Sequence, residues 1–348
     1  MNPPSVLLQC RAGFEKECAQ EIIATATSMG VEGFVKAKPD SGYAVFRAHD
    51  DARGAELGEN LPFEHLVFPR QAARVGELLA DLPEGDRVTP IVAAARALGT
   101  AFSELWIETP DTNDGKALAS LTRPLAVHLE RGLAKAGVGL KAPGAPRLHV
   151  FFVGGRACYV GISDHARSSP WPMGIVRLRM PSHAPSRSTL KLAEAFLVLV
   201  GTRDFPPALT AVDLGASPGG WTYQLVQRGF MVTAVDNGAM DEALLQSGQV
   251  RHRREDAFHF KPPEPVDWMV CDMVESPSRI ARLVARWIGE GQCRETIFNL
   301  KLPMKKRWEE VQRCREILDE GLGGGGYFLR MKHLYHDREE VTAYLARR

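Results

Sequence analysis

Three features are scarce or absent in this sequence of 348 residues, and each absence excludes a class of protein. The 43 Lys+Arg nearly balance the 42 Asp+Glu, which excludes proteins that bind nucleic acid through bulk positive charge. No apolar run approaches the roughly 18 residues of a membrane-spanning helix, and no basic and apolar leader opens the chain. The six scattered cysteines form no C-x-x-C pair, so neither a zinc ribbon nor a disulfide framework is indicated. We therefore expect a cytoplasmic protein.

The first half of the chain has the pattern of an α+β region. The 45% hydrophobic content suits a folded chain, and the length predicts two or three domains. Apolar strands at 6–10 and 42–48 flank a helical pattern at 14–30. Residues 147–162 predict a hairpin that turns at two glycines, and residues 68–82 predict a helix.

A change of composition separates the two halves. The segment 165–191 is rich in proline and serine and has no acidic residue. We interpret 166–187 as a linker, with a helix beginning near Ser188. The basic residues of 165–191 predict either a solvated loop or contact with nucleic acid. They are Arg167, Arg177, Arg179, Arg187 and Lys191.

From residue 188 onward, strands and helices alternate. This rhythm predicts a doubly wound parallel α/β sheet, because parallel strands need helical crossovers between them. The last two strands are separated by only a short turn, so they predict an antiparallel hairpin at the sheet edge. The predicted strands are 209–215, 231–237, 267–273, 295–302, 326–336 and 339–348.

A glycine-rich loop, AVDLGASPGGW, spans residues 211–221. Gly215, Gly219 and Gly220 allow the backbone to approach a ligand closely after a strand that ends near Asp213. Ser217 replaces the middle glycine of G-x-G-x-x-G, which disfavours a dinucleotide site, and no G-K-[ST] marks a nucleotide triphosphatase.

Four acidic residues are expected where successive strands end: Asp213, Asp236, Asp256 and Asp272. Asp236 follows Asp213 at the spacing of an acid that binds ribose hydroxyls. Any one aspartate could instead cap a helix or turn. The set beside the glycine loop favours an adenosine-bearing ligand that has no phosphate.

The same loop matches G-x-S-x-G, the nucleophile elbow of serine hydrolases, with Ser217 as nucleophile. That machinery needs a backbone N–H from the following residue. Pro218 has none, and the missing donor is worth about 3 kcal/mol of transition-state stabilisation. A hydrolase is therefore a minor alternative.

The segment from Ser188 onward resembles the S-adenosylmethionine-dependent methyltransferases, and more closely the 2′-O-ribose RNA methyltransferases of the FtsJ/RrmJ type. The strings DLGASPGGWTYQLVQRG, VDNG, DWMVCDM, ETIFNLKLPMKKR and LYHDREEVT carry the resemblance. Within that class they look like bacterial enzymes that methylate a cytidine ribose of large-subunit (23S) ribosomal RNA. The resemblance implies a Rossmann-like methyltransferase sheet, S-adenosylmethionine as cofactor and ribosomal RNA as partner.

The resemblance also implies a Lys-Asp-Lys-Glu tetrad, which falls on Lys191, Asp272, Lys301 and Glu340. Glu339 competes with Glu340, because side chains alternate along a strand and only one of the two can face the site. Ser217 stands where relatives carry cysteine or alanine. The residues implied to line the cofactor pocket are Ser188, Asp213, Gly215, Ser217, Pro218, Gly219, Gly220, Trp221, Asp236, Asp256 and Asp272.

The first half is similar to the ferredoxin-like and THUMP arrangement of that family, on the string CRAGFEKE and the closing hairpin. The implied domains are a ferredoxin-like subdomain at 1–60 and a THUMP-like, RNA-presenting domain at 61–165. The basic linker at 166–187 and the methyltransferase domain at 188–348 follow.

In-line attack of a ribose 2′-hydroxyl on an activated methyl group needs alignment and the removal of one proton. Our hypothesis is that Lys301 accepts or directs this proton, while Lys191 and the carboxylates fix its position. RNA contact is predicted at the linker 165–191 and at Arg251, Arg253, Arg254, Lys305, Lys306 and Arg307.

Other chemistries fit the sequence less well. Carbon-5 methylation needs a cysteine nucleophile, but Cys271 should point away from the side that Asp272 faces. His333 and His336 lie three apart, so on a strand they face opposite sides and no metal site is predicted. A noncatalytic RNA-binding or ribosome-assembly factor on the same fold is the alternative from a different functional class.

Overall fold

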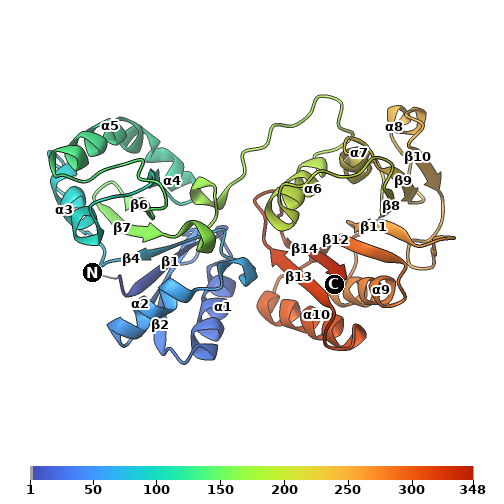
Figure 1. Ribbon diagram of the computed structural model, residues 1–348, viewed down its shortest axis with the longest axis horizontal. Coiled ribbons are helices and arrows are strands. Elements are labelled where there is room, and N and C mark those ends of the chain that lie inside the picture. The colour runs from blue at the N-terminus through green and yellow to red at the C-terminus, as the bar shows by residue number, and fades with distance from the viewer. Residues whose placement is uncertain (1–2, 348) are drawn as a thin grey trace. The chain divides into compact units, whose positions relative to one another are not determined.

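The computed structural model describes residues 3–347, and the chain divides after Ile175 into two compact units (Figure 1). Each unit is built on its own seven-stranded sheet. Within the described residues, no helix has both the length and the apolar character needed to cross a membrane.

The N-terminal unit has one mixed sheet in the order β2-β3-β1-β4-β7-β6-β5. All neighbouring strands are antiparallel except β5 and β6. The strands are β1 (Ser5–Gln9), β2 (Gly33–Ala37), β3 (Tyr43–Ala48), β4 (Gln71–Val75), β5 (Leu105–Glu108), β6 (Arg147–Gly154) and β7 (Ala157–Ser163). The helices are α1 (Glu15–Ser28), α2 (Asp51–Asn60), α3 (Val88–Leu98), α4 (Asn113–Ala117) and α5 (Ala119–Lys135).

The prediction of a helix over 68–82 is wrong, because this stretch contains β4. All five residues of β4 are buried between β1 and β7 in the middle of the sheet. A strand that is buried on both faces has no alternation of apolar and polar residues to reveal it. Arg74 is accommodated by ion pairs with Glu59 (3.3 Å) and Asp164 (3.1 Å).

The residues that follow β7 belong to the N-terminal unit up to Ile175. Gln71 donates from Nε2 to the carbonyls of Ser169 (3.2 Å) and Trp171 (3.0 Å). Gly174 approaches the Arg70 carbonyl so closely that a Cβ there would lie 1.9 Å from the oxygen. The first part of the segment that the sequence indicates as a linker is therefore packed against the sheet.

The C-terminal unit has the sheet order β10-β9-β8-β11-β12-β14-β13. The strands from β10 to β12 are parallel, while β14 is antiparallel to both β12 and β13. This is the expected doubly wound, Rossmann-like sheet with an antiparallel pair at one side. Its strands are β8 (Thr210–Leu214), β9 (Met231–Val235), β10 (Val250–Arg253), β11 (Val266–Cys271), β12 (Cys293–Lys301), β13 (Tyr327–Lys332) and β14 (Glu340–Arg347).

Helices cover the two faces of this sheet (Figure 1). They are α6 (Thr189–Ala195), which continues into a π-helical turn at Phe196–Val200, α7 (Gly220–Val226), α8 (Glu242–Gln246), α9 (Pro277–Gly289) and α10 (Arg307–Gly321). On the α6 and α7 side, the core contains Leu192, Leu225, Trp268, Ile297 and Tyr344. Side chains alternate along a strand, so residues two or four positions further along the strand from these core residues point to the same face of the sheet.

Candidate active site

Strand register brings the charged residues of the sheet edge together. Lys301, the last residue of β12, pairs in register with Glu340, the first residue of β14. Asp272 follows β11 directly, two positions after the buried Val270. Lys191 comes from α6, which packs on the same face. Four chain segments thus deliver two lysines and two carboxylates to one place.

The four side chains form a continuous series of ion pairs. Lys301 Nζ contacts Asp272 Oδ1, and Lys191 Nζ lies 3.7 Å from Asp272 Oδ2 and also contacts Glu340 Oε1. The side chains are between 9% and 22% exposed, so the group is shielded but reachable. Burial lowers the pKa of Lys191, but the carboxylates of Asp272 and Glu340 outweigh burial and bring its pKa above the usual value. Lys191 is therefore a cation suited to holding its neighbours in place.

Glu340, rather than Glu339, faces this group. The carboxylate of Glu339 pairs with Arg307 (2.6 Å) and is 59% exposed. The two glutamates separate as strand alternation requires.

The glycine loop takes the backbone conformations that its glycines allow. Gly215 and Gly219 have φ of 80° and 120°, which side chains other than glycine rarely adopt. A Cβ on Gly220 would lie 2.2 Å from Ser188 Oγ. The absence of a side chain at Gly220 thus lets Ser188 reach the loop.

Asp213 is completely buried beside this loop. Its Oδ2 accepts a hydrogen bond from Thr222 Oγ1 (2.6 Å), while Oδ1 has no hydrogen-bond partner among the described residues. Burial raises the pKa of Asp213 to about 7, against the lowering effect of the Thr222 hydrogen bond. A buried acceptor without a partner is expensive, and a ligand that donates to it would satisfy it.

Asp236 and Asp256 hold loop backbone at the next two strand ends. Asp236 accepts from the N–H groups of Ser217 (3.1 Å) and Gly238 (2.7 Å). Asp256 is exposed and accepts from the Phe258 N–H (2.8 Å), which lowers its pKa. Each carboxylate thus shapes a turn at the same edge of the sheet as Asp213.

Three residues of the predicted cofactor set, Trp221, Pro218 and Ser217, have surroundings that differ from one another. The Trp221 ring is 3% exposed and packs in the hydrophobic core, so its side chain does not line the loop. Pro218 is exposed at the tip of the loop. Ser217 donates its hydroxyl to the Ala239 carbonyl (2.7 Å), so its proton is engaged by backbone rather than by a histidine base.

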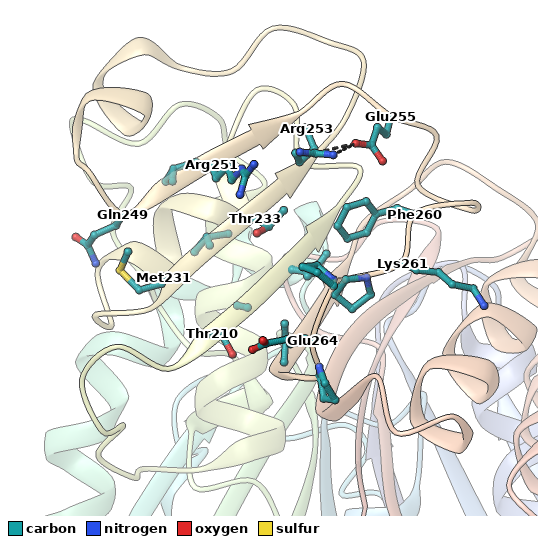
Figure 2. A pocket seen from close by; sticks show the side chains of 18 of the residues that line it. Thr210, Met231, Thr233, Gln249, Arg251, Arg253, Glu255, Phe260, Lys261 and Glu264 are labelled. Atoms are coloured by element: carbon teal, nitrogen blue, oxygen red, sulfur yellow. Dashed lines mark hydrogen bonds and ion pairs between the residues drawn. The ribbon is translucent and has the colours of Figure 1, made fainter.

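The predicted RNA-contacting cations lie at several places on the two units. Arg251, Arg254, Lys305 and Lys306 are exposed. Arg253 pairs with Glu255, as Figure 2 shows, and Arg307 pairs with Glu339. The linker arginines Arg167, Arg177, Arg179 and Arg187 are also exposed.

A hollow of about 750 Å³ lies on the face of β8, β9 and β10 (Figure 2). No helix separates β10 from β11, so the segment 254–265 crosses this face as a loop. The lining residues include Thr210, Met231 and Gln249 at or beside the strand starts and Phe260 in that loop. They include no residue of the tetrad and none of 213–221. It is therefore separate from the strand-end site.

Sequence reasoning missed a second layer of polar residues around the tetrad. Glu194, one turn after Lys191, accepts from the N–H groups of Tyr335 and His336 (both 2.9 Å) and from His336 Nδ1 (2.6 Å). Asn299 donates to Asp272 (2.9 Å). Asn299 lies two residues before Lys301, so strand alternation alone would have placed it on the same face. Within residues 3–347, no cluster of three or more His, Cys, Asp or Glu is arranged to hold a metal ion.

The fold and site define an S-adenosylmethionine-dependent methyltransferase, and the comparisons specify the class. Residues 184–288 match the FtsJ-like methyltransferase family. Residues 3–73 match the RlmM ferredoxin-like domain, and residues 86–164 match the N-terminal domain of ribosomal RNA large subunit methyltransferase M.

The chain belongs to the ribosomal RNA large subunit methyltransferase M family. It is 53% identical to that protein of Methylococcus capsulatus, over 99% of this chain and 98% of the relative. The protein of the same description from Actinobacillus pleuropneumoniae is 49% identical, over 97% of each chain. Solved structures are more distant: an Aeropyrum pernix fibrillarin aligns with a TM-score of 0.33 and 16% identity, covering 57% of this chain and 81% of the fibrillarin.

The residues of this site fit S-adenosylmethionine. The unpartnered Asp213 Oδ1 is an acceptor for a ligand group that donates, and the row of carboxylates suits a ligand that carries a positive sulfonium. The loop offers close backbone approach without the lysine that a phosphate site employs. Ser188, the glycine loop, Asp236 and Asp256 would hold the cofactor.

Proposed function

We propose that this protein methylates the ribose 2′-hydroxyl of a cytidine in large-subunit (23S) ribosomal RNA. The observation that carries the proposal is the series Lys301, Asp272, Lys191 and Glu340 at the carboxyl edge of a methyltransferase sheet. When bound, S-adenosylmethionine supplies an activated methyl group. The tetrad is left with two tasks, which are to orient the hydroxyl and to take its proton.

Lys301 is the proton acceptor in this proposal. At an ordinary pKa near 10.4, neutralising a lysine at pH 7 costs about 4 to 5 kcal/mol. Asp272 contacts both Lys301 and Lys191 and so holds the Lys301 side chain in position. Lys191, with its raised pKa, stays charged and orients the two carboxylates.

The site supports ribose chemistry better than base chemistry. Carbon-5 methylation would need a cysteine thiolate, but Cys271 is fully buried and burial raises its pKa to about 12. Asp272-Met273-Val274-Glu275 also differs from the [ND]-P-P-[YF] string of many amine methyltransferases. A hydroxyl acceptor beside lysines and carboxylates remains the best match.

We assign presentation of the RNA to residues 1–165 and phosphate contact to the basic residues beyond them. Residues 1–165 contain 17 Lys+Arg and 20 Asp+Glu, whereas residues 166–348 contain 26 and 22. The exposed Arg251, Arg254, Lys305 and Lys306 are available for phosphates. We place the reaction in the cytoplasm, where ribosomal RNA is found and where the six free cysteines stay reduced.

Two other functions have weaker support. A noncatalytic assembly factor would have no use for paired lysines and carboxylates at the strand ends. A serine hydrolase would need a free Ser217 hydroxyl, but that hydroxyl donates to a backbone carbonyl.

The deciding experiment incubates the full chain with S-adenosylmethionine carrying a labelled methyl group and unmodified large-subunit ribosomal RNA. We expect label in an alkali-resistant ribose linkage at a single cytidine. Label on a base or on protein would overturn the proposed position, and no transfer to any RNA would support the assembly-factor alternative. RNA that already carries the modification is the matched control and should accept no label.

A further inference from the structure

A hydrogen-bond series runs away from the tetrad behind Asp272. Asn299 Nδ2 donates to Asp272 Oδ1 (2.9 Å), and Asn299 Oδ1 lies 2.7 Å from Thr342 Oγ1. Thr342 Oγ1 in turn lies 3.0 Å from Asp337 Oδ1 and 2.9 Å from Asp337 Oδ2. Asn299 and Thr342 are register partners in β12 and β14, and the three residues of this series are fully buried.

Counting protons fixes the direction of this series. Asn299 donates from Nδ2 to Asp272, which also contacts both lysines, so the carbonyl oxygen of Asn299 faces Thr342. The single hydroxyl proton of Thr342 is then donated to Asn299. Thr342 has no second proton for Asp337, although their oxygens are within hydrogen-bonding distance.

We propose that Asp337 carries a proton in the working enzyme and that Asp337, Thr342 and Asn299 form a one-way hydrogen-bond chain that positions the Asp272 carboxylate. Asp337 Oδ2 accepts from the Leu334 N–H (3.0 Å), and the proposed proton lies between Asp337 and Thr342 Oγ1 and is donated to Thr342. The three residues are positioning residues, because they act on the methyl acceptor through Asp272. This inference rests on the function proposed above.

The surroundings of Asp337 favour its neutral form. Burial, followed by the nearby carboxylates of Glu340 and Glu194, raises the pKa of Asp337 well above its usual value. The opposing hydrogen bond from the Leu334 N–H is a smaller effect. The charged and titratable side chains of the packed elements are Lys191 and Glu194 on α6, Lys332 on β13, Glu340 on β14, and His333 and His336 in the connecting loop.

Neutrality at Asp337 has a consequence for the reaction. The tetrad as it stands balances two ammonium groups against two carboxylates. A third carboxylate at Asp337 would add negative charge beside the tetrad and raise the pKa of Lys191 further. It would also take the Thr342 proton, which leaves Asn299 without a donor and Asp272 without a fixed partner.

Substitutions distinguish a positioning role of these hydrogen bonds from a purely structural role in packing. We expect Thr342→Val to lower kcat on the order of tenfold, because a buried donor to Asn299 is lost, while KM for S-adenosylmethionine and RNA stays within about twofold. Thr342→Ser should restore most of kcat. Asp337→Asn should stay within about threefold of the unmodified chain, because its amide donates to Thr342 and its carbonyl accepts from Leu334. Thr233→Val, a threonine of β9 in the hollow of Figure 2, is the matched control.

The protonation state is measured directly on the full chain labelled with ¹³C at the aspartate carboxyls. The resonance that disappears in Asp337→Asn should keep the shift of a protonated acid from pH 6 to pH 8. A carboxylate shift at pH 6 would overturn the proposal, as would wild-type kcat in Thr342→Val or a loss in Asp337→Asn as large as that in Thr342→Val. The NMR measurement needs no methyl transfer, so its failure is distinguishable from failure of the proposed function.

Discussion

In the N-terminal unit, His149 is sealed between Glu108 and Ser163, at 2.6 Å from Nδ1 and 2.7 Å from Nε2. In the C-terminal unit, Asp213 is equally buried, yet one of its carboxylate oxygens has no partner among the described residues. Both ring nitrogens of His149 are therefore hydrogen-bonded within the protein, whereas Asp213 keeps one carboxylate oxygen available to accept from a ligand. Spare hydrogen-bonding capacity, rather than residue type, separates a candidate site from a structural network.

The serine residues of the two units show the same difference. Ser163, His149 and Glu108 have the order of contacts of a hydrolase triad, but all three are buried and Glu108 also accepts from the Met173 N–H (2.5 Å). Ser217 lies in a hydrolase-like motif, but its hydroxyl donates to the Ala239 carbonyl and contacts no histidine among the described residues. The array in the N-terminal unit therefore ties β5, β6 and β7 to the segment around Met173.

The largest expected effect concerns Lys301. Lys301→Ala should lower kcat by about 10³-fold, because the proposed proton acceptor is lost, and general-base contributions are typically about 10² to 10⁴. Methyl transfer is measured with both substrates saturating, and cofactor binding is measured separately by calorimetry. The exposed Lys261→Ala is the control and should keep the wild-type rate. Near-normal transfer by Lys301→Ala would contradict the role assigned to Lys301.

The corresponding change in the N-terminal unit should affect stability rather than chemistry. His149→Ala leaves the Glu108 carboxylate and the Ser163 hydroxyl without their partner, at a cost of about 3 kcal/mol. Denaturant unfolding should show an earlier transition for this unit, because the two units need not unfold together.

The exposed His128→Ala provides the matched control and should unfold as the unmodified chain does. A loss of kcat in His149→Ala without a loss of stability would mean that the N-terminal array takes part in the reaction.

Much of this comparison could be predicted from the sequence, but not all of it. The alternating strands and helices indicated the second sheet, and strand alternation separated Glu340 from Glu339. The central strand β4 was missed because burial on both faces removes its alternation. The link between Asn299 and Thr342 depends on the pairing of β12 with β14, which tertiary folding sets across 43 residues of sequence.

A third test concerns Asp213, because a buried carboxylate oxygen without a hydrogen-bond partner should lower the free energy of unfolding. Its pKa is about 7 in the folded protein and near 3.8 when unfolded, so the folded state binds a proton more firmly between these values. Stability of the unmodified chain should therefore fall as pH rises from about 4 to about 7, by up to about 4 kcal/mol from this group.

Asp213→Asn should lose this pH dependence and be the more stable protein at pH 8. The free energy of unfolding is measured across that pH range, with the exposed Asp204→Asn as the control. Equal slopes for Asp213→Asn and the unmodified chain would show that Asp213 does not titrate near neutrality.

The smallest effect belongs to the surface, where Arg253 and Arg254 are neighbours with different surroundings. Arg253 already pairs with Glu255, with Nε at 2.8 Å from Oε1. Arg254 is exposed and forms no ion pair with the described residues of the C-terminal unit. Arg254→Ala should weaken RNA binding a few-fold and reduce the slope of log K against log salt by about 1, because one phosphate contact releases about one counterion. Arg253→Ala should change the slope less, since Glu255 already neutralises that guanidinium.

Binding of a fragment of large-subunit ribosomal RNA is titrated at several salt concentrations, and kcat is measured in parallel. Equal slopes for both variants and the unmodified chain would remove this edge of the sheet from the RNA interface.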